Sequence, residues 1–221
     1  DDKNTDGYKS LKARAEANEA FGAELKKGKK ADAQRGYEIA CKEWMDVRSF
    51  GQVFAFKGSD LSLGIRGPVS VQPAFSVDPI DITSMQITKS VNSEDKEGKS
   101  SDTMGMKHRV DFGVYILKGS INVQLSEKTG FTEEDAEKIK EAIRTLFVND
   151  SSSARPDGSM VMHKLYWWKH NCKIGQYSSH KVHNSIEIKK KEGVRNPRKI
   201  EDYEIICHEL PGLAGGEYEG L

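Results

Sequence analysis

The stretch at residues 103–122 constrains the fold most, because a long run of β-branched and aromatic residues follows a polar segment there. The alternating apolar side chains of this run are Val110, Phe112, Val114 and Ile116. Since successive side chains of a strand point to opposite faces, these residues share one face. We therefore expect a strand that buries this face and leaves the face of Arg109, Asp111 and Tyr115 free for partners.

Basic residues gather where this strand is expected to begin. Lys107, His108 and Arg109 follow one another close to Gly105. Donors mounted at the start of a strand can be presented to an anionic partner. The alternative is an exposed hairpin whose basic residues are merely solvated.

Charge is balanced over the whole chain, with 34 basic and 34 acidic residues, but it is unevenly distributed. Residues 151–199 carry eleven Lys and Arg against three acidic residues, whereas residues 201–221 carry six acidic residues and no basic one. This separation predicts a surface that holds an anionic polymer, and ends that can complement each other between adjacent copies. The alternative is that both runs are solvated faces.

The three cysteines, Cys41, Cys172 and Cys207, form no Cys-x-x-Cys motif. Their odd number and wide spacing argue against a disulfide framework and favour a reducing compartment. No apolar run approaches the roughly 18 to 20 residues of a membrane span, and no signal-peptide pattern is present. We therefore expect a cytoplasmic protein without membrane contact.

Periodicity predicts helices and strands in mixed order. Besides the strand described above, the expected elements are a helical or poorly ordered segment at 1–30, a helix at 31–45, strands at 46–56, 69–77, 85–91, 160–170, 185–188 and 200–207, and loops at 58–64 and 149–158. A further helix should follow Thr132, a good N-cap, because acidic residues suit the positive first turn. This order indicates an α+β fold of ferredoxin-like type around a mainly antiparallel sheet.

Residues 92–102 contain no apolar side chain. They join two expected strands and can contribute nothing to a core. We therefore expect a long hairpin whose tip projects from the domain.

The motifs of common enzymes are absent, namely the nucleophile elbow, the phosphate loop, the dinucleotide fingerprint and the zinc-protease helix. The best metal candidates are His163, His170, Cys172, His180 and His183, but their spacing matches no zinc pattern. The sequence therefore predicts no metal and no cofactor. His108 could be a general base oriented by Asp111, but beside Lys107 and Arg109 a contact residue is the favoured interpretation.

Arginine and hydroxyl side chains at strand ends and in loops suit phosphate oxygens, because guanidinium groups can make two parallel hydrogen bonds to them. The residues of this kind are Arg48, Arg66, Lys107, Arg109, Ser151, Ser152, Ser153 and Arg155. The alternative for Arg48 is a buried ion pair with Asp46 or Asp78.

Several spaced motifs, in this order, resemble the repeated backbone subunit of the type I-C CRISPR surveillance complex (Cascade). The motifs are Asp46-Val47-Arg48-Ser49-Phe50-Gly51, Arg66-Gly67-Pro68-Val69, Ser76-Val77-Asp78-Pro79-Ile80, Thr103-Met104-Gly105-Met106-Lys107-His108, Gly119-Ser120-Ile121-Asn122, Glu127-Lys128-Thr129-Gly130-Phe131 and Ser153-Ala154-Arg155-Pro156. The resemblance covers residues 31–188. The family's first strand and first helix have no counterpart before Ala31, so we expect that part to be missing or different.

The resemblance implies a modified RNA-recognition-motif palm domain at residues 31–200, with a thumb hairpin at about 85–110 and an acidic segment at 201–221. It implies copies that line up along CRISPR RNA, clamp its backbone and hold it open for pairing with invading DNA. Partners would be CRISPR RNA, the target DNA strand, further copies of the chain, and the guide-end-capping, large and small subunits of Cascade. Met104 and Met106, at the base of the thumb, would contact displaced bases, and His108 joins the RNA-binding set.

The resemblance also implies a non-catalytic subunit, since type I complexes leave cutting to a recruited helicase-nuclease. The alternatives are a CRISPR-associated ribonuclease and a stand-alone single-stranded RNA-binding module. In the related type III complexes the backbone subunit cuts through an aspartate near the thumb, which directs attention to Asp95 and Asp102.

Overall fold

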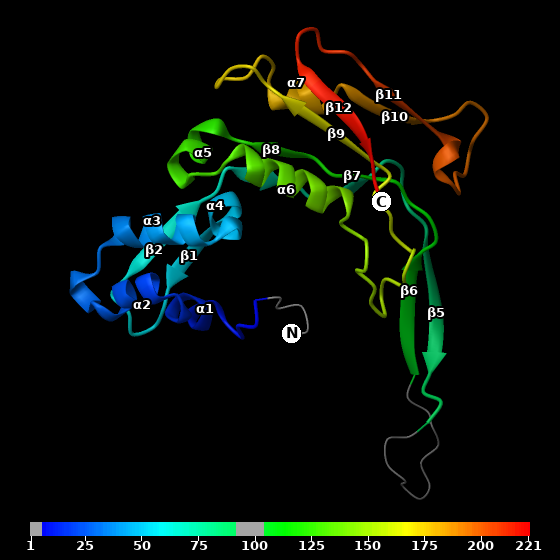
Figure 1. Cartoon of the computed structure of the whole chain (residues 1–221). Helices are drawn as coiled ribbons and strands as arrows, with labels where there is room; N and C mark the ends of the chain where they lie inside the picture. The colour runs from blue at the N-terminus through cyan, green and yellow to red at the C-terminus, as the bar shows by residue number, and fades with distance from the viewer. Residues whose placement is uncertain (1–5, 92–103) are drawn as a thin grey trace, which may run out of the picture. The chain divides into compact units, whose positions relative to one another are not determined.

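The computed structural model describes residues 6–91 and 104–221, which divide into two compact units (Figure 1). Unit 1 comprises Asp1–Val71, Gly119–Ser178 and Pro211–Leu221, and unit 2 comprises Gln72–Lys118 and Ser179–Leu210. Both contain helices and pairs of antiparallel strands. The mixed α and β class is therefore confirmed, whereas the ferredoxin-like sheet stays a prediction. The projecting tip of the thumb also stays a prediction, because residues 92–103 lie outside the described part.

The elements of unit 1 are α1 (Leu11–Ala17), α2 (Glu19–Lys26), the 3-10 helix η1 (Gly28–Lys30), α3 (Ala33–Glu43), α4 (Met45–Phe50), β1 (Gly51–Ala55), β2 (Ser62–Arg66), β3 (Val69–Val71), β8 (Gly119–Ile121), α5 (Val123–Thr129), α6 (Glu133–Arg144), β9 (Lys164–Lys169) and β12 (Ala214–Glu219). The elements of unit 2 are β4 (Phe75–Ser76), β5 (Ile82–Thr88), β6 (Met104–Val110), β7 (Tyr115–Ile116), α7 (Ser179–His183), β10 (Ile186–Lys190), the 3-10 helix η2 (Ile200–Asp202) and β11 (Tyr203–Cys207). The strands of unit 1 pair as β1–β2, β3–β8 and β9–β12. The strands of unit 2 pair as β4–β7, β5–β6 and β10–β11.

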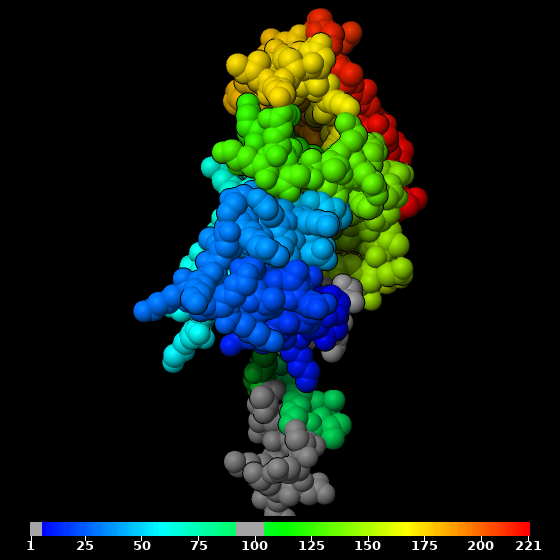
Figure 2. Space-filling model, turned by 60° about the vertical axis from the view of Figure 1, so that its left-hand side comes forward, coloured from blue at the N-terminus to red at the C-terminus, as the bar shows by residue number. Residues whose placement is uncertain are grey.

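The N-terminal helices belong to the core of unit 1. Phe21 of α2 is fully buried, and its ring lies 5.3 Å from that of Trp44 and 4.8 Å from that of Phe54. Figure 2 shows the dark-blue atoms of α1 and α2 packed closely against the lighter blue atoms of α3. One aromatic side chain therefore secures a segment that has few other large apolar residues.

The expected strand at 46–56 and the expected loop at 58–64 are both partly wrong. Trp44 is extended (φ −117°, ψ 111°), which ends α3 and allows a second short helix, α4, to begin at Met45. Gly51, with φ 85°, then ends α4 and starts β1, and a side chain there would lie 2.2 Å from the carbonyl oxygen of Ile65. The loop is shorter than expected because Ser62 already pairs with Ala55.

The helix predicted after Thr132 is confirmed as α6, and its N-terminus carries the main ion pair of unit 1. The Thr132 side chain accepts a hydrogen bond from the Asp135 amide, and the Asp135 carboxylate accepts one from the Thr132 amide. That carboxylate is 1% exposed and also accepts hydrogen bonds from Nε and Nη2 of Arg48 at 2.8 and 2.7 Å. These bonds, with the Arg48 contribution largest, lower the pKa of Asp135 to about 2.

The ion pair expected for Arg48 exists, but its partner is neither Asp46 nor Asp78. Asp46 accepts a hydrogen bond from Nη2 of Arg14 at 2.9 Å, and Asp78 accepts one from the Tyr203 hydroxyl at 2.8 Å. The true partner is 87 residues away along the chain. The tertiary fold of unit 1, in which α4 packs against α5 directly before α6, brings the two residues together.

The expected long strand within 103–122 is interrupted in the structure. β6 ends at Val110, which is 41% exposed, and β7 contains only Tyr115 and Ile116. Phe112 is half-buried, and its ring lies 6.5 Å from that of the buried Tyr203. The alternation therefore predicts burial correctly only after β6, because all seven residues of β6 are exposed in an isolated two-stranded ribbon.

The acidic C-terminal residues include a strand, β12, that the sequence did not predict. β12 pairs with β9 in unit 1, where Glu217 forms an ion pair with Lys164. In unit 2, Glu204 of β11 lies 3.7 Å from Lys189 of β10. Several acidic residues thus neutralise cations of the same chain, and complementarity between copies stays a prediction.

The stability of the protein should fall on acidification as Asp135 becomes protonated. Its pKa is lowered from 3.8 to about 2, so the stabilisation is complete above about pH 4 and is lost as the pH falls towards 2. We expect Asp135→Asn to reduce the difference in unfolding free energy between neutral and acid pH. Denaturant titrations at several pH values measure this, with Asp157→Asn as the control in an exposed loop. Equal pH dependence in both variants would contradict the assignment.

Candidate nucleic-acid interface

The residues predicted to bind RNA divide between the two units. Those in unit 1 are Arg48, Arg66, Ser151, Ser152, Ser153 and Arg155. Those in unit 2 are Met104, Met106, Lys107, His108 and Arg109, all of them on β6. The predicted set is therefore not confined to one compact unit.

The β5–β6 ribbon sorts its side chains onto two faces. Lys107 lies opposite Met85 and Arg109 opposite Thr83, so these four residues share one face, which we call the cationic face. Gly105 continues this face opposite Ile87. Two positive charges, exposed apolar side chains and a position without a side chain are therefore neighbours on one open surface.

The two cations of this face differ in their partners. Nε of Arg109 donates to Asp111 at 2.7 Å, and the same carboxylate accepts a hydrogen bond from the Thr83 hydroxyl at 2.7 Å. The Thr83 bond first and the Arg109 bond second lower the pKa of Asp111. Lys107 makes no ion pair within the described residues, so its ammonium group is available to an external anion.

The opposite face of β6 carries Met104, Met106 and His108. The two methionines are 63% and 57% exposed, and Gln86 donates to the Met104 sulfur. Nδ1 of His108 lies 2.8 Å from the Ser84 hydroxyl. His108 and Asp111 therefore have separate partners, and the hydrogen bond that would orient His108 as a general base is not formed.

Arg66 ends β2 on the open face of the β1–β2 pair. It lies opposite Gly51, and the adjoining positions on that face are Val53, which is 63% exposed, and Gly64. The next residue, Gly67, fixes the path of the chain, because a side chain there would lie 2.2 Å from the Ser49 carbonyl oxygen. Arg66 is exposed and has no ion pair among the described residues, so it can reach a phosphate without giving up a partner.

Arg155 is engaged within its own loop. Its Nη2 donates to Asp150 at 2.9 Å, and its backbone exchanges hydrogen bonds with Ser152 at 2.7 and 3.1 Å. Its Nε is buried and has no partner among the described residues. Ser151, Ser152 and Ser153 are exposed beside this turn.

Arg48 is held more firmly than any other member of the predicted set. Besides its two bonds to Asp135, its Nη1 lies 3.5 and 3.3 Å from the carbonyl oxygens of Cys41 and Lys42. All three nitrogens of the guanidinium group therefore face protein acceptors. The geometry gives Arg48 a structural role, and a contact with RNA stays a prediction.

Two of the histidines considered as metal ligands, His170 and His180, have hydrogen-bonding neighbours of their own. Nδ1 of His170 accepts a hydrogen bond from the Gln176 amide at 3.0 Å, and the ring of His180 lies 2.9 Å from the Asn184 amide nitrogen. No group of three or more His, Cys, Asp or Glu side chains suited to a metal ion occurs at positions 6–91 and 104–221. In the same part of the chain no helix is long and apolar enough to cross a membrane.

The sequence missed the residues that support β6 from across the ribbon, namely Thr83, Ser84 and Gln86. Each contacts the side chain of a predicted site residue or of its neighbour. The available signal was the alternation of polar and apolar residues at 84–88, which does not include Thr83. That alternation indicates a strand but not its register, and the register determines which side chains meet.

Comparison with models of protein families identifies a match to this chain. The model of the family described as CRISPR-associated protein Cas7 matches residues 3–208. No curated protein matches the chain.

Arg48→Ala and Arg66→Ala should differ in their effect on the free energy of unfolding, because Arg48 is held in the fold and Arg66 is exposed. Loss of Arg48 leaves Asp135 buried without its cation, and we expect the free energy of unfolding to fall by about 3 kcal/mol. Arg66→Ala removes an exposed side chain and should change it by less than about 0.5 kcal/mol. Chemical unfolding of both variants measures this, and an Arg48→Ala variant as stable as the parent would refute the structural role.

Proposed function

This chain belongs to the Cas7 family of CRISPR-associated proteins, and from this premise we propose that it is a backbone subunit that binds CRISPR RNA. Copies of it would line up along the guide and present it for pairing with invading DNA. The family match over residues 3–208 carries this proposal. The type I-C assignment rests on the motifs of the sequence and is part of the proposal.

The cationic face of the β5–β6 ribbon supports backbone recognition. A guide must be held whatever its sequence, so contacts should go to phosphate and sugar and leave the base edges free. Lys107 and Arg109 are exposed on one face of the ribbon. Such an open surface suits a continuous phosphate chain better than a single small ligand.

The opposite face suggests a second contact of the same subunit. Met104 and Met106 are exposed and have flexible, polarisable side chains. We assign them to contacts with displaced bases at the base of the thumb. We further propose that the chain associates with the other Cascade subunits and with the target DNA strand, and that it acts in the cytoplasm.

We propose a non-catalytic role for this chain. To act as a general base, His108 would need Asp111 to orient it, but the Asp111 carboxylate is hydrogen-bonded to Thr83 and Arg109. Asp95 and Asp102, the other acidic candidates, lie outside the described residues. Incubation with labelled RNA, with and without Mg²⁺, tests this role, and the RNA should remain intact in both cases.

Lys107→Ala with Arg109→Ala should weaken binding to unrelated RNA sequences equally. Each phosphate contact that is lost should lower the salt slope of single-strand binding by roughly 0.7, or about 1.4 for both. Affinity for two unrelated spacers, measured across a salt series, provides the test. A folded variant that loses affinity for only one spacer, or keeps the parental slope, would exclude backbone clamping by this ribbon.

A matched control removes the same charge elsewhere. Lys12 and Lys138 are exposed on helices and form ion pairs with Glu16 and Glu134. Replacing both with alanine also removes two positive charges and should leave the salt slope close to the parental value. An equal loss in this control would show that net charge, rather than position, governs binding.

A further inference from the structure

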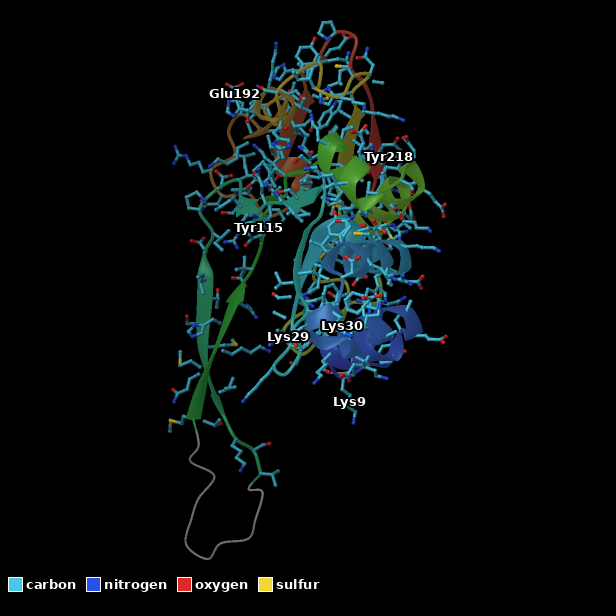
Figure 3. All side chains as sticks on the ribbon, turned by 90° about the vertical axis from the view of Figure 1, so that its left-hand side faces the viewer. Lys9, Lys29, Lys30, Tyr115, Glu192 and Tyr218 are labelled. Atoms are coloured by element: carbon cyan, nitrogen blue, oxygen red, sulfur yellow. The ribbon has the colours of Figure 1, made fainter. Side chains whose placement is uncertain are left out.

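A second group of cations lies on unit 2, away from β6 in sequence. Residues 191–199, which we call the basic loop, connect β10 to η2 and contain one acidic residue, Glu192. Its basic residues are Lys191, Arg195, Arg198 and Lys199. Figure 3 labels Glu192 and so locates the loop at the end of the β10–β11 hairpin.

Asp202 closes the basic loop at both ends. Its carboxylate accepts hydrogen bonds from the amides of Arg198 at 2.7 Å and Lys199 at 3.2 Å, and its carbonyl accepts one from the Lys191 amide at 2.9 Å. The Arg198 bond contributes most to a lowered pKa of Asp202. Gly193, with φ 81°, makes the tight turn within the loop. The loop therefore has a defined path that one acidic residue maintains.

The base of the hairpin is fixed in turn to the core of unit 2. Tyr203 follows Asp202, is 6% exposed, and donates its hydroxyl to Asp78 at 2.8 Å. Lys190 also lies 3.1 Å from Asp78. The buried Tyr203 and the Asp78 carboxylate, which contacts both Tyr203 and Lys190, therefore hold the base of the basic loop in place.

Charge pairing separates the hairpin strands from the loop. Lys189 and Lys190 have carboxylates within 4 Å, provided by Glu204 and Asp78. The four basic residues of the loop are all exposed, and no ion pair of theirs occurs in the described residues. Arg198 acts electrostatically on Asp111, and Lys191 and Lys199 act on Asp202, where they help to lower the pKa of these carboxyl groups. The cations of β10 thus have carboxylates within 4 Å, whereas those of the loop interact with carboxylates only at longer range and stay exposed.

We propose that the basic loop is a second nucleic-acid contact, which binds the phosphates of a nucleic-acid backbone in addition to the cationic face of the ribbon. Guanidinium groups engage phosphate oxygens with two parallel bonds, and lysines add point charges. The loop has no aromatic side chain to stack on a base, so it recognises the backbone without reading sequence. Guide RNA and duplex DNA share this chemistry, and the test distinguishes them.

The test compares a double variant, which carries both Arg195→Ala and Arg198→Ala, with the parent chain. The probes are a short single-stranded RNA and a short duplex DNA of unrelated sequence, measured by fluorescence anisotropy across a salt series. We expect roughly 10-fold weaker binding to at least one probe, and a salt slope lower by about 0.7 per lost contact for RNA or 0.9 for duplex DNA. A larger loss for RNA assigns the loop to the guide, and a larger loss for duplex assigns it to DNA.

Lys169→Ala with Lys173→Ala is the matched control. These lysines are exposed but form ion pairs with Glu133 and Glu127, so their removal changes the net charge equally. The control should bind both probes nearly as the parent does. An equal loss in the control, parental binding by the folded Arg195 and Arg198 variant, or a parent that binds neither probe would overturn the proposal.

Asp202→Ala tests the geometry of the loop, because it adds one positive charge while removing the acceptor that closes the loop. Attraction by net charge alone predicts tighter binding, whereas a preformed loop predicts weaker binding, and we expect the latter. A melting curve verifies folding, and tighter binding would overturn the preformed loop. Lys107 and Arg109 are unchanged in all of these variants, so an RNA-binding loss confined to the Lys107 and Arg109 variant would bear on the proposed function, and a loss confined to the Arg195 and Arg198 variant would bear on the basic loop.

Discussion

The bidentate pair between Arg48 and Asp135 is the interaction on which the arrangement of unit 1 depends. Asp135 sits in the first turn of α6, where a carboxylate is favoured by the free amides, and Arg48 reaches the carbonyl groups at the end of α3, where a cation is favoured. One pair thus complements two helix ends of opposite polarity. Because β1 begins directly after α4, the same pair also fixes the starting point of the strand that faces Arg66.

Features with a local cause could be predicted from the sequence. Thr132 and the acidic residues after it specify the start of α6 by themselves, and the helix begins there. Features with a distant cause could not be predicted. Arg48 has Asp46 nearby in sequence, but Asp46 is held by Arg14, and no local pattern points to Asp135. The strand β12 was missed for a similar reason. Its glycines have low strand propensity, and their partners, Trp167 and Trp168 of β9, are distant in sequence.

The candidate site also has features that the sequence predicts and features that it does not. Alternation was sufficient to place Lys107 and Arg109 on one face of a strand, and the structure has them there. It could not show that Arg109 is tethered by Asp111, that Arg155 is bound to Asp150, or that β6 lacks a buried face. Each of these depends on a loop conformation or a strand register, which single-residue patterns do not specify.

Pairing within the fold decides which cations can serve a polyanion. A cation that already holds a carboxylate, such as Arg48, must lose that partner before it binds phosphate, and for a buried carboxylate the loss is costly. An exposed cation with no ion pair among the described residues, such as Lys107, exchanges only water and counterions, and the release of counterions favours binding. An equal number of acidic and basic residues therefore does not argue against nucleic-acid binding here. Acidic residues neutralise cations such as Arg48 and Arg14, whereas Lys107, Arg66 and the basic loop have no ion pair within positions 6–91 and 104–221.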